Sequence, residues 1–134
     1  MDYPEVPGKV LKKLRPICLA LPDAYEEQAW TGVRWMVRKK TFAHVLAIDE
    51  QSPPALQRAY RGDPIVMVTF RSEPPELDIL QHAGHPFFRA GWGRNVIGLI
   101  IDKATDWTEV AELMTDSYCV MAPKKLAALI MERG

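Results

Sequence analysis

The sequence predicts an α+β fold in which helices pack on one antiparallel sheet. Strand-like segments follow each other directly at residues 33–38 and 40–49, without the long crossover that parallel strands need. The whole chain gives the order helix, hairpin, strand, helix, strand, helix, helix, which is typical of α+β domains. A length of 134 residues, without an internal repeat or a convincing linker, predicts a single domain, 1–134.

The first helix is expected at residues 8–20. Its apolar side chains recur at helical spacing, and they are Val10, Leu11, Leu14, Ile17, Cys18 and Leu21. Pro16 lies inside this segment and should kink or split the helix, because proline lacks a backbone N–H. After Pro22, residues 23–27 predict a short capped helical turn with Asp23 as its N-cap.

The middle of the chain predicts three strands. Residues 33–38 and 40–49 are rich in β-branched and aromatic side chains, and the break between them is so short that we expect a hairpin. Its turn at Arg38-Lys39 contains no Gly or Asn, which leaves the turn type open. Residues 50–64 are expected to be a surface connection with a weakly helical centre, and the apolar run 65–70 is the third strand.

A helix is expected between this strand and the next. Ser72 should cap it, Pro74 should lie in its first turn, and Gly84 should end it. Its buried side is expected to contain Leu77, Ile79, Leu80 and Ala83. Residues 85–93 then predict a loop or a short extended piece.

The last third predicts a strand followed by two helices. The strand is the apolar run 96–101. Asp106 and Glu109 resemble a capping box that opens a helix. One apolar stripe of that helix is formed by Trp107, Val110, Ala111, Met114 and Tyr118. Pro123 is expected to start the final helix.

Composition narrows the function classes. Lys plus Arg equals Asp plus Glu at 17 each, and a net charge of zero weighs against a strongly basic, non-specific nucleic-acid binder. Two cysteines, Cys18 and Cys119, are too few for a disulfide framework. No apolar run approaches the ~20 residues of a membrane helix, and the N-terminus has no signal-peptide pattern. We therefore expect a cytoplasmic protein without a membrane partner.

No residue pattern predicts catalysis. His82 and His85 have a spacing that suits a metal, but Gly84 and Pro86 break the helix that would hold both imidazoles on one face. Both cysteines lie in apolar surroundings, where a structural thiol is the simpler interpretation. We therefore expect no catalytic residue, no metal and no cofactor, and we do not expect an enzyme.

The candidate nucleic-acid contacts are four basic residues, Arg34, Arg38, Lys39 and Lys40. No acidic residue interrupts positions 31–48. On a hairpin, Arg34, Arg38 and Lys40 should share one face, with Lys39 at the tip. A projecting basic hairpin of this kind can grip phosphates. The alternative is an ordinary solvated hairpin tip.

A second candidate site is a concave ligand pocket. The side chains that could line it are Trp30, Trp35, His44 and Trp92. The alternative is that these side chains belong to the core, since aromatic residues at junctions of sheet and helix usually pack there.

Several short motifs, in a fixed order, resemble one known family. They are Cys18-Leu-Ala-Leu-Pro22 with Glu26, the hairpin segment with Lys40 and Phe42-Ala43, Phe87-Phe88 before Trp92-Gly93, Asp106-Trp107, Ser117-Tyr118, and Ala122-Pro-Lys-Lys-Leu126. On these residues the chain resembles the MmcQ/YjbR-like proteins, a family of small bacterial domains. It departs from the family pattern where Arg38-Lys39 replaces a Gly-rich turn and where Val96 replaces a frequent Trp.

The resemblance implies an architecture like that of type III secretion chaperones, with two hairpin wings on an antiparallel sheet. It also implies a role in DNA binding, which has been suggested for related members. The formyltransferase label that some members carry is not expected here, because the chain has no phosphate loop and no Asn-His-Asp constellation. The leading hypothesis is thus a non-enzymatic DNA-binding module that uses the basic hairpin. The alternative is a protein- or small-ligand-binding domain of chaperone-like fold.

Overall fold

The computed structural model describes residues 4–49, 52, 65–91 and 93–133, and it confirms the α+β class. Its six strands form one antiparallel sheet in the order β1-β2-β3-β4-β6-β5. The strands are β1 (Tyr25–Gln28), β2 (Val33–Val37), β3 (Lys40–Ile48), β4 (Ile65–Arg71), β5 (Phe87–Arg89) and β6 (Val96–Ile101). The helices in the described part are α1 (Gly8–Leu19), α3 (Glu76–His82), α4 (Trp107–Met121) and α5 (Lys124–Arg133).

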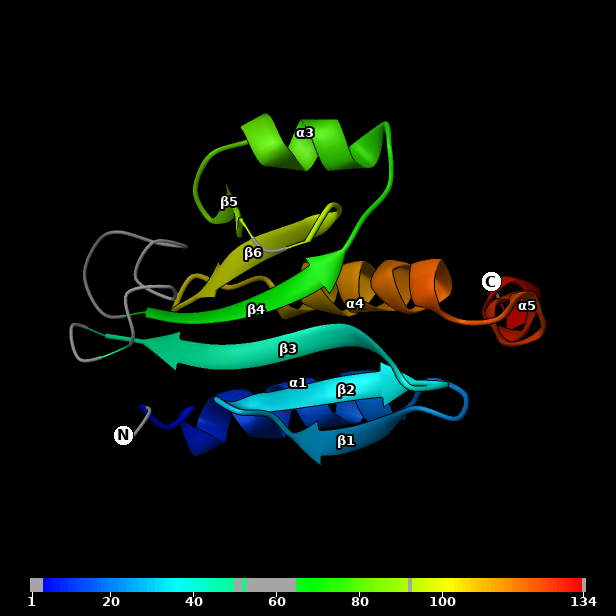
Figure 1. Cartoon of the computed structure of the whole chain (residues 1–134), viewed down its shortest axis with the longest axis horizontal. Coiled ribbons are helices and arrows are strands. Elements are labelled where there is room, and N and C mark those ends of the chain that lie inside the picture. Colours follow the sequence, from blue (N-terminus) through cyan, green and yellow to red (C-terminus); the bar gives the residue numbers. More distant parts are fainter. Residues whose placement is uncertain (1–3, 50–51, 53–64, 92, 134) are drawn as a thin grey trace.

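The main core lies between the sheet and two helices. Figure 1 shows α1 and α4 on one face of the sheet, α3 beside β5 at one edge, and α5 at one end of the molecule. The helices contribute the buried side chains Val10, Leu14 and Cys18 from α1 and Val110, Leu113, Met114 and Tyr118 from α4. The opposite face of the sheet carries a smaller buried cluster made by Leu46, Ile48 and Met67. Inner strands such as β6 are therefore buried along their whole length.

Most of the elements with a strong local signal form as expected. β2 and β3 make the predicted hairpin, and β4 and β6 occupy the two predicted apolar runs. Asp106 caps α4, since its side chain accepts hydrogen bonds from the backbone N–H groups of Thr108 at 3.0 Å and Glu109 at 3.2 Å. Gly84 follows α3 with a φ of 80°, and α5 begins directly after Pro123.

The expectation that Pro16 splits the first helix is wrong. α1 is one continuous helix with Pro16 inside it. The missing N–H of Pro16 would have bonded the carbonyl of Lys12, and both residues are exposed. Water can bond that carbonyl instead, so the helix persists.

The expected helical turn at residues 23–27 is also wrong. Asp23 is not an N-cap but has a left-handed backbone with a φ of 59°, and the next residues form β1. β1 exists because it pairs with β2, with Tyr25 opposite Met36. This tertiary pairing overrides the weak local preference of an acidic segment.

The helix after β4 starts later than expected. α3 begins at Glu76, and Ser72 does not cap it but is buried, with its backbone N–H bonded to the carbonyl of Asn95 at 3.0 Å. Pro74 and Pro75 stand between them, and a residue before proline avoids helical backbone angles. Of the expected buried side, Leu80 is buried, whereas Ile79 is 65% exposed.

The expected connection at 50–64, apart from Ser52, lies outside the described residues together with its weak helix. None of the helices in the described ranges is both long and apolar enough to cross a membrane.

Candidate nucleic-acid interface

The β2–β3 turn presents three adjacent cations at one end of the sheet (Figure 1). Val37 pairs with Lys40, and the two residues between them have positive φ angles, 49° for Arg38 and 67° for Lys39. This is a type I′ geometry, whose twist matches that of the flanking strands. Arg38, Lys39 and Lys40 are all exposed. The backbone N–H of Lys39 also donates to the hydroxyl of Tyr25 at 3.2 Å, which ties the turn to β1.

Arg34 does not share a face with the turn cations. It pairs with His44, whereas Lys40 pairs with Val37, a core residue on the helix-covered face. The expected common face of Arg34, Arg38 and Lys40 is therefore wrong. A two-residue turn consumes Arg38 and Lys39, so the period of two does not continue from β2 into β3.

Carboxylates from the segment around β1 approach the basic hairpin. Asp23 lies 3.2 Å from Arg38, with side chains 58% and 61% exposed, and Glu27 lies 3.4 Å from Arg34. Exposed pairs of this kind contribute about 0–1 kcal/mol each, so a phosphate can replace Asp23 beside Arg38. Lys39 and Lys40 make no ion pair with any described residue. The sequence could not reveal these partners, because Glu27 lies on β1 and Asp23 just before it, and β1 has no local β signal.

Arg34 belongs instead to a half-buried polar group on the sheet. The Nε2 of His44 lies 2.7 Å from the carbonyl of Thr31. Burial lowers the pKa of His44, and the charge of Arg34 adds to this effect, whereas the hydrogen bond to Thr31 opposes it. The net effect is a lowered pKa, so the ring is neutral at pH 7 and its Nε2–H donates to that carbonyl. The Nε of Arg34 and the hydroxyl of Thr31 are buried without a partner among the described residues. Arg34 is thus less available to a large anion than the turn cations are.

The described residues of the predicted aromatic pocket do not all line one site, because Trp35 and His44 lie on opposite faces of the sheet. Trp35 is fully buried on the helix-covered face, and its Nε1–H donates to Glu26 at 3.0 Å. His44 lies on the other face, because it is one residue away from Ala43, the partner of Trp35. Trp30 is 60% exposed, and Trp92 lies outside the described residues. Trp35 therefore serves the core and the attachment of β1.

The Ser117-Tyr118 motif holds the interior together rather than forming a site. Phe42 is the extra residue of a bulge in β3, since Trp35 pairs with Ala43 and Met36 with Thr41. The hydroxyl of Ser117 donates to the carbonyl of Phe42 at 2.5 Å and accepts from the backbone N–H of Arg71 at 2.7 Å.

Tyr118 completes this arrangement. Its ring packs edge-on against Phe42, with 5.5 Å between the ring centroids, and its hydroxyl donates to the carbonyl of Pro22 at 2.6 Å. Burial, followed by the nearby carboxylate of Asp23, raises the pKa of Tyr118, so the hydroxyl stays protonated and can donate. The end of α4 is thereby fixed to the loop before β1.

The cysteines are held as protonated thiols, and two of the histidines have polar partners. Burial raises the pKa of both Cys18 and Cys119, which keeps the thiols protonated and unreactive. His82 bonds the carbonyl of Asp78 at 2.8 Å, and His85 lies 3.8 Å from Asp102. Within the described ranges, no three His, Cys, Asp or Glu side chains gather as metal ligands would.

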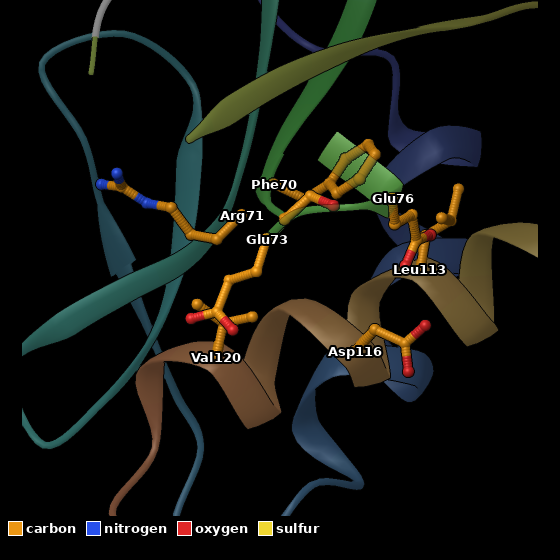
Figure 2. Close-up of a pocket in the computed structure, with 8 residues that line it drawn as sticks. Phe70, Arg71, Glu73, Glu76, Leu113, Asp116 and Val120 are labelled. Carbon is orange, nitrogen blue, oxygen red and sulfur yellow. The ribbon is translucent and has the colours of Figure 1, made fainter. Parts of the chain in front are cut away.

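A pocket of about 180 Å³ lies between the end of β4, the start of α3 and α4 (Figure 2). It is lined by Phe70, Arg71, Ser72, Glu73, Glu76, Leu113, Asp116 and Val120. Figure 2 shows that the side chain of Arg71 extends away from Asp116, and its Nη1 donates to Asn95 at 3.2 Å. Three carboxylates therefore dominate the lining. Such a surface repels phosphate, so we do not assign this pocket to the candidate nucleic-acid interface.

The YjbR family model matches residues 19–120 of the chain. The chain belongs to the YjbR family. The YjbR match covers the segment from the end of α1 almost to the end of α4, and it contains the contacts that Ser117 and Tyr118 make with Phe42 and Pro22. The match thus contains the whole sheet and α3, whereas most of α1 and all of α5 lie outside it. No protein of the curated set matches the chain.

Proposed function

We infer that this YjbR-family protein binds double-stranded DNA through the β2–β3 turn and does so without catalysing a reaction. The observation that carries this inference is the row of three exposed cations, Arg38, Lys39 and Lys40, on a tight turn. Residues 28–48, which include both flanking strands, contain no carboxylate. The one carboxylate shown in an ion pair with these cations, that of Asp23, is exposed and replaceable.

The turn suits the phosphate backbone rather than the bases. Lysine and arginine side chains at a turn can each neutralise one phosphate, and such contacts carry no sequence information. Three neutralised phosphates give a fall of log affinity with log salt of slope about −3. We therefore expect weak, salt-sensitive binding with little sequence preference, which is compatible with a net charge of zero.

Fluorescence anisotropy of a short labelled duplex tests this inference. The variant Arg38→Asn/Lys39→Gly/Lys40→Gln removes three charges and retains the turn, because Asn-Gly is the favoured pair for type I′ geometry. At low salt its affinity should fall by about tenfold or more, and the magnitude of its salt slope should fall by about 3. The matched control is Lys9→Ala/Lys103→Ala, since both lysines are exposed and the segments that carry them, the start of α1 and the loop after β6, lie at the opposite end of the molecule (Figure 1). The control should bind like the wild type.

A second variant should act in the opposite direction. Asp23→Asn removes the carboxylate that lies 3.2 Å from Arg38, and Asn tolerates the left-handed backbone of this position. Its affinity for the same duplex should rise by about two- to fivefold, because the phosphate no longer competes with Asp23. Absence of wild-type binding at low salt, or equal affinity of all variants, would overturn the DNA-binding inference.

The other candidate, a protein- or small-ligand-binding domain, stays a prediction. The described pocket beside α3 is its one structural feature, and its carboxylates stand on exposed surfaces where acidic residues are common. The turn cations form the more specific arrangement, so we advance DNA binding.

A further inference from the structure

A second basic segment lies at the same end of the molecule as the β2–β3 turn. Lys124 and Lys125 form the first turn of α5, and both are exposed. Residues 117–131 contain no carboxylate. Figure 1 shows α5 and the β2–β3 turn together at one end of the long axis, away from the start of α1.

Contacts of Tyr118 hold the end of α4, which α5 follows, against the loop before β1. Tyr118 lies near the C-terminal end of α4, and its hydroxyl bonds the carbonyl of Pro22, the residue before Asp23. The charges of Asp23 and Arg38 both reach the Tyr118 hydroxyl closely enough to affect its pKa. The chain then leaves α4 at Ala122 in an extended conformation and enters α5 directly. The lysines of α5 therefore follow closely on a residue that is anchored beside the turn.

Lys124 and Lys125 do not stabilise α5. The amino end of a helix is its positive end, and acidic residues, not basic ones, are favourable there. α5 has no acidic residue in its first turn and two lysines instead. A buried role is excluded as well, because both side chains are exposed.

We propose that Lys124 and Lys125 join Arg38, Lys39 and Lys40 in one surface that contacts the phosphate backbone of duplex DNA. This proposal rests on the inferred DNA binding by the turn. A duplex carries one charge per about 1.7 Å of its axis, so a single rigid backbone can meet cations from two elements at once. The surface includes α5, which lies outside the YjbR match, and its lysines belong to Ala122-Pro-Lys-Lys-Leu126, one of the motifs by which the chain resembles the family.

The test is the salt dependence of duplex binding for four proteins: the wild type, Lys124→Ala/Lys125→Ala, the triple turn variant, and the control Lys9→Ala/Lys103→Ala. In the α5 variant the slope of log affinity against log salt should be smaller in magnitude by about 2, because two cations are removed. The control should keep the wild-type slope. The Tm of the α5 variant should equal or exceed that of the wild type, because alanine favours the helix and the unfavourable charges are gone. A lower affinity therefore cannot be assigned to unfolding.

The outcomes separate the two inferences. If the α5 variant keeps the wild-type slope while the turn variant loses its slope, the joint surface is overturned and DNA binding by the turn stands. If the turn variant keeps the wild-type slope, or the wild type does not bind, DNA binding by the turn fails and the joint surface fails with it.

Discussion

At the scale of single residues, Ser117 shows how a polar side chain comes to lie in the core. The bulge in β3 removes the carbonyl of Phe42 from the sheet ladder, and a buried carbonyl without a partner is costly. The hydroxyl of Ser117 donates a hydrogen bond to this carbonyl and also accepts one from the backbone N–H of Arg71. One hydroxyl on α4 therefore satisfies two backbone groups on two neighbouring strands.

The variant Ser117→Ala should lower the free energy of unfolding by about 2–4 kcal/mol, because it leaves both backbone groups buried without a partner. Urea denaturation followed by circular dichroism measures this change. Thr115→Ala is the matched control, since the Thr115 hydroxyl bonds only the Ala111 carbonyl of its own helix at 2.8 Å. The control should change stability by less than about 0.5 kcal/mol. Equal losses in the two variants would contradict the role assigned to Ser117.

The basic residues of the hairpin could be identified from the sequence, but their surroundings could not. Arg38, Lys39 and Lys40 stand in an acid-free stretch, and the structure exposes all three. The pairing of Arg34 with Glu27 and of Arg38 with Asp23 depends on where β1 lies, and no periodicity marks that strand. The charge of a segment can be read from its own residues, whereas the carboxylates that pair with it come from other segments and depend on the fold.

At the scale of elements, the sequence predicted the helices and strands that have a strong local signal, which is either a residue that starts a helix or a continuous apolar run. The Asp106 cap, the Pro123 start and the apolar runs of β4 and β6 are of this kind. β1 was missed because a strand of Tyr25, Glu26, Glu27 and Gln28 owes its conformation to β2 rather than to its own residues. α3 was placed too early because two prolines delay the first helical turn.

The β2–β3 turn retains backbone strain that glycine would relieve. Lys39 has a φ of 67°, and this left-handed conformation costs a side-chain-bearing residue about 1–2 kcal/mol. Glycine relieves that cost but makes the unfolded chain more flexible, so Lys39→Gly should stabilise the protein by about 0.5–1 kcal/mol. Thermal or urea denaturation measures the gain.

The adjacent position provides the control for this prediction. Lys40 is the first residue of β3, where no left-handed backbone strain needs relief. Lys40→Gly should therefore destabilise the protein by about 0.5–1 kcal/mol, because glycine loses more conformational entropy on folding than lysine does. A loss of stability in Lys39→Gly would contradict the type I′ turn.

At the scale of the whole molecule, a net charge of zero hides an uneven distribution. Three carboxylates line the pocket between β4, α3 and α4, and the exposed cations of the β2–β3 turn and α5 form a separate group at the same end of the long axis (Figure 1). A neutral protein of this kind can still approach DNA with one end, since the field near a surface depends on the local charges. The YjbR match contains the sheet that carries the turn, and α5 provides a second basic segment beyond the matched residues.

The most direct test of this account is a titration of the ¹⁵N-labelled protein with a short DNA duplex at low salt, followed by amide NMR. We expect the largest shift changes at residues 38–40 and 124–125, with none at residues 101–105 at the far end of the sheet. The changes should vanish as salt is raised, because they report phosphate contacts. Shift changes confined to the far end or to the acidic pocket, or no change with DNA in excess, would contradict the account.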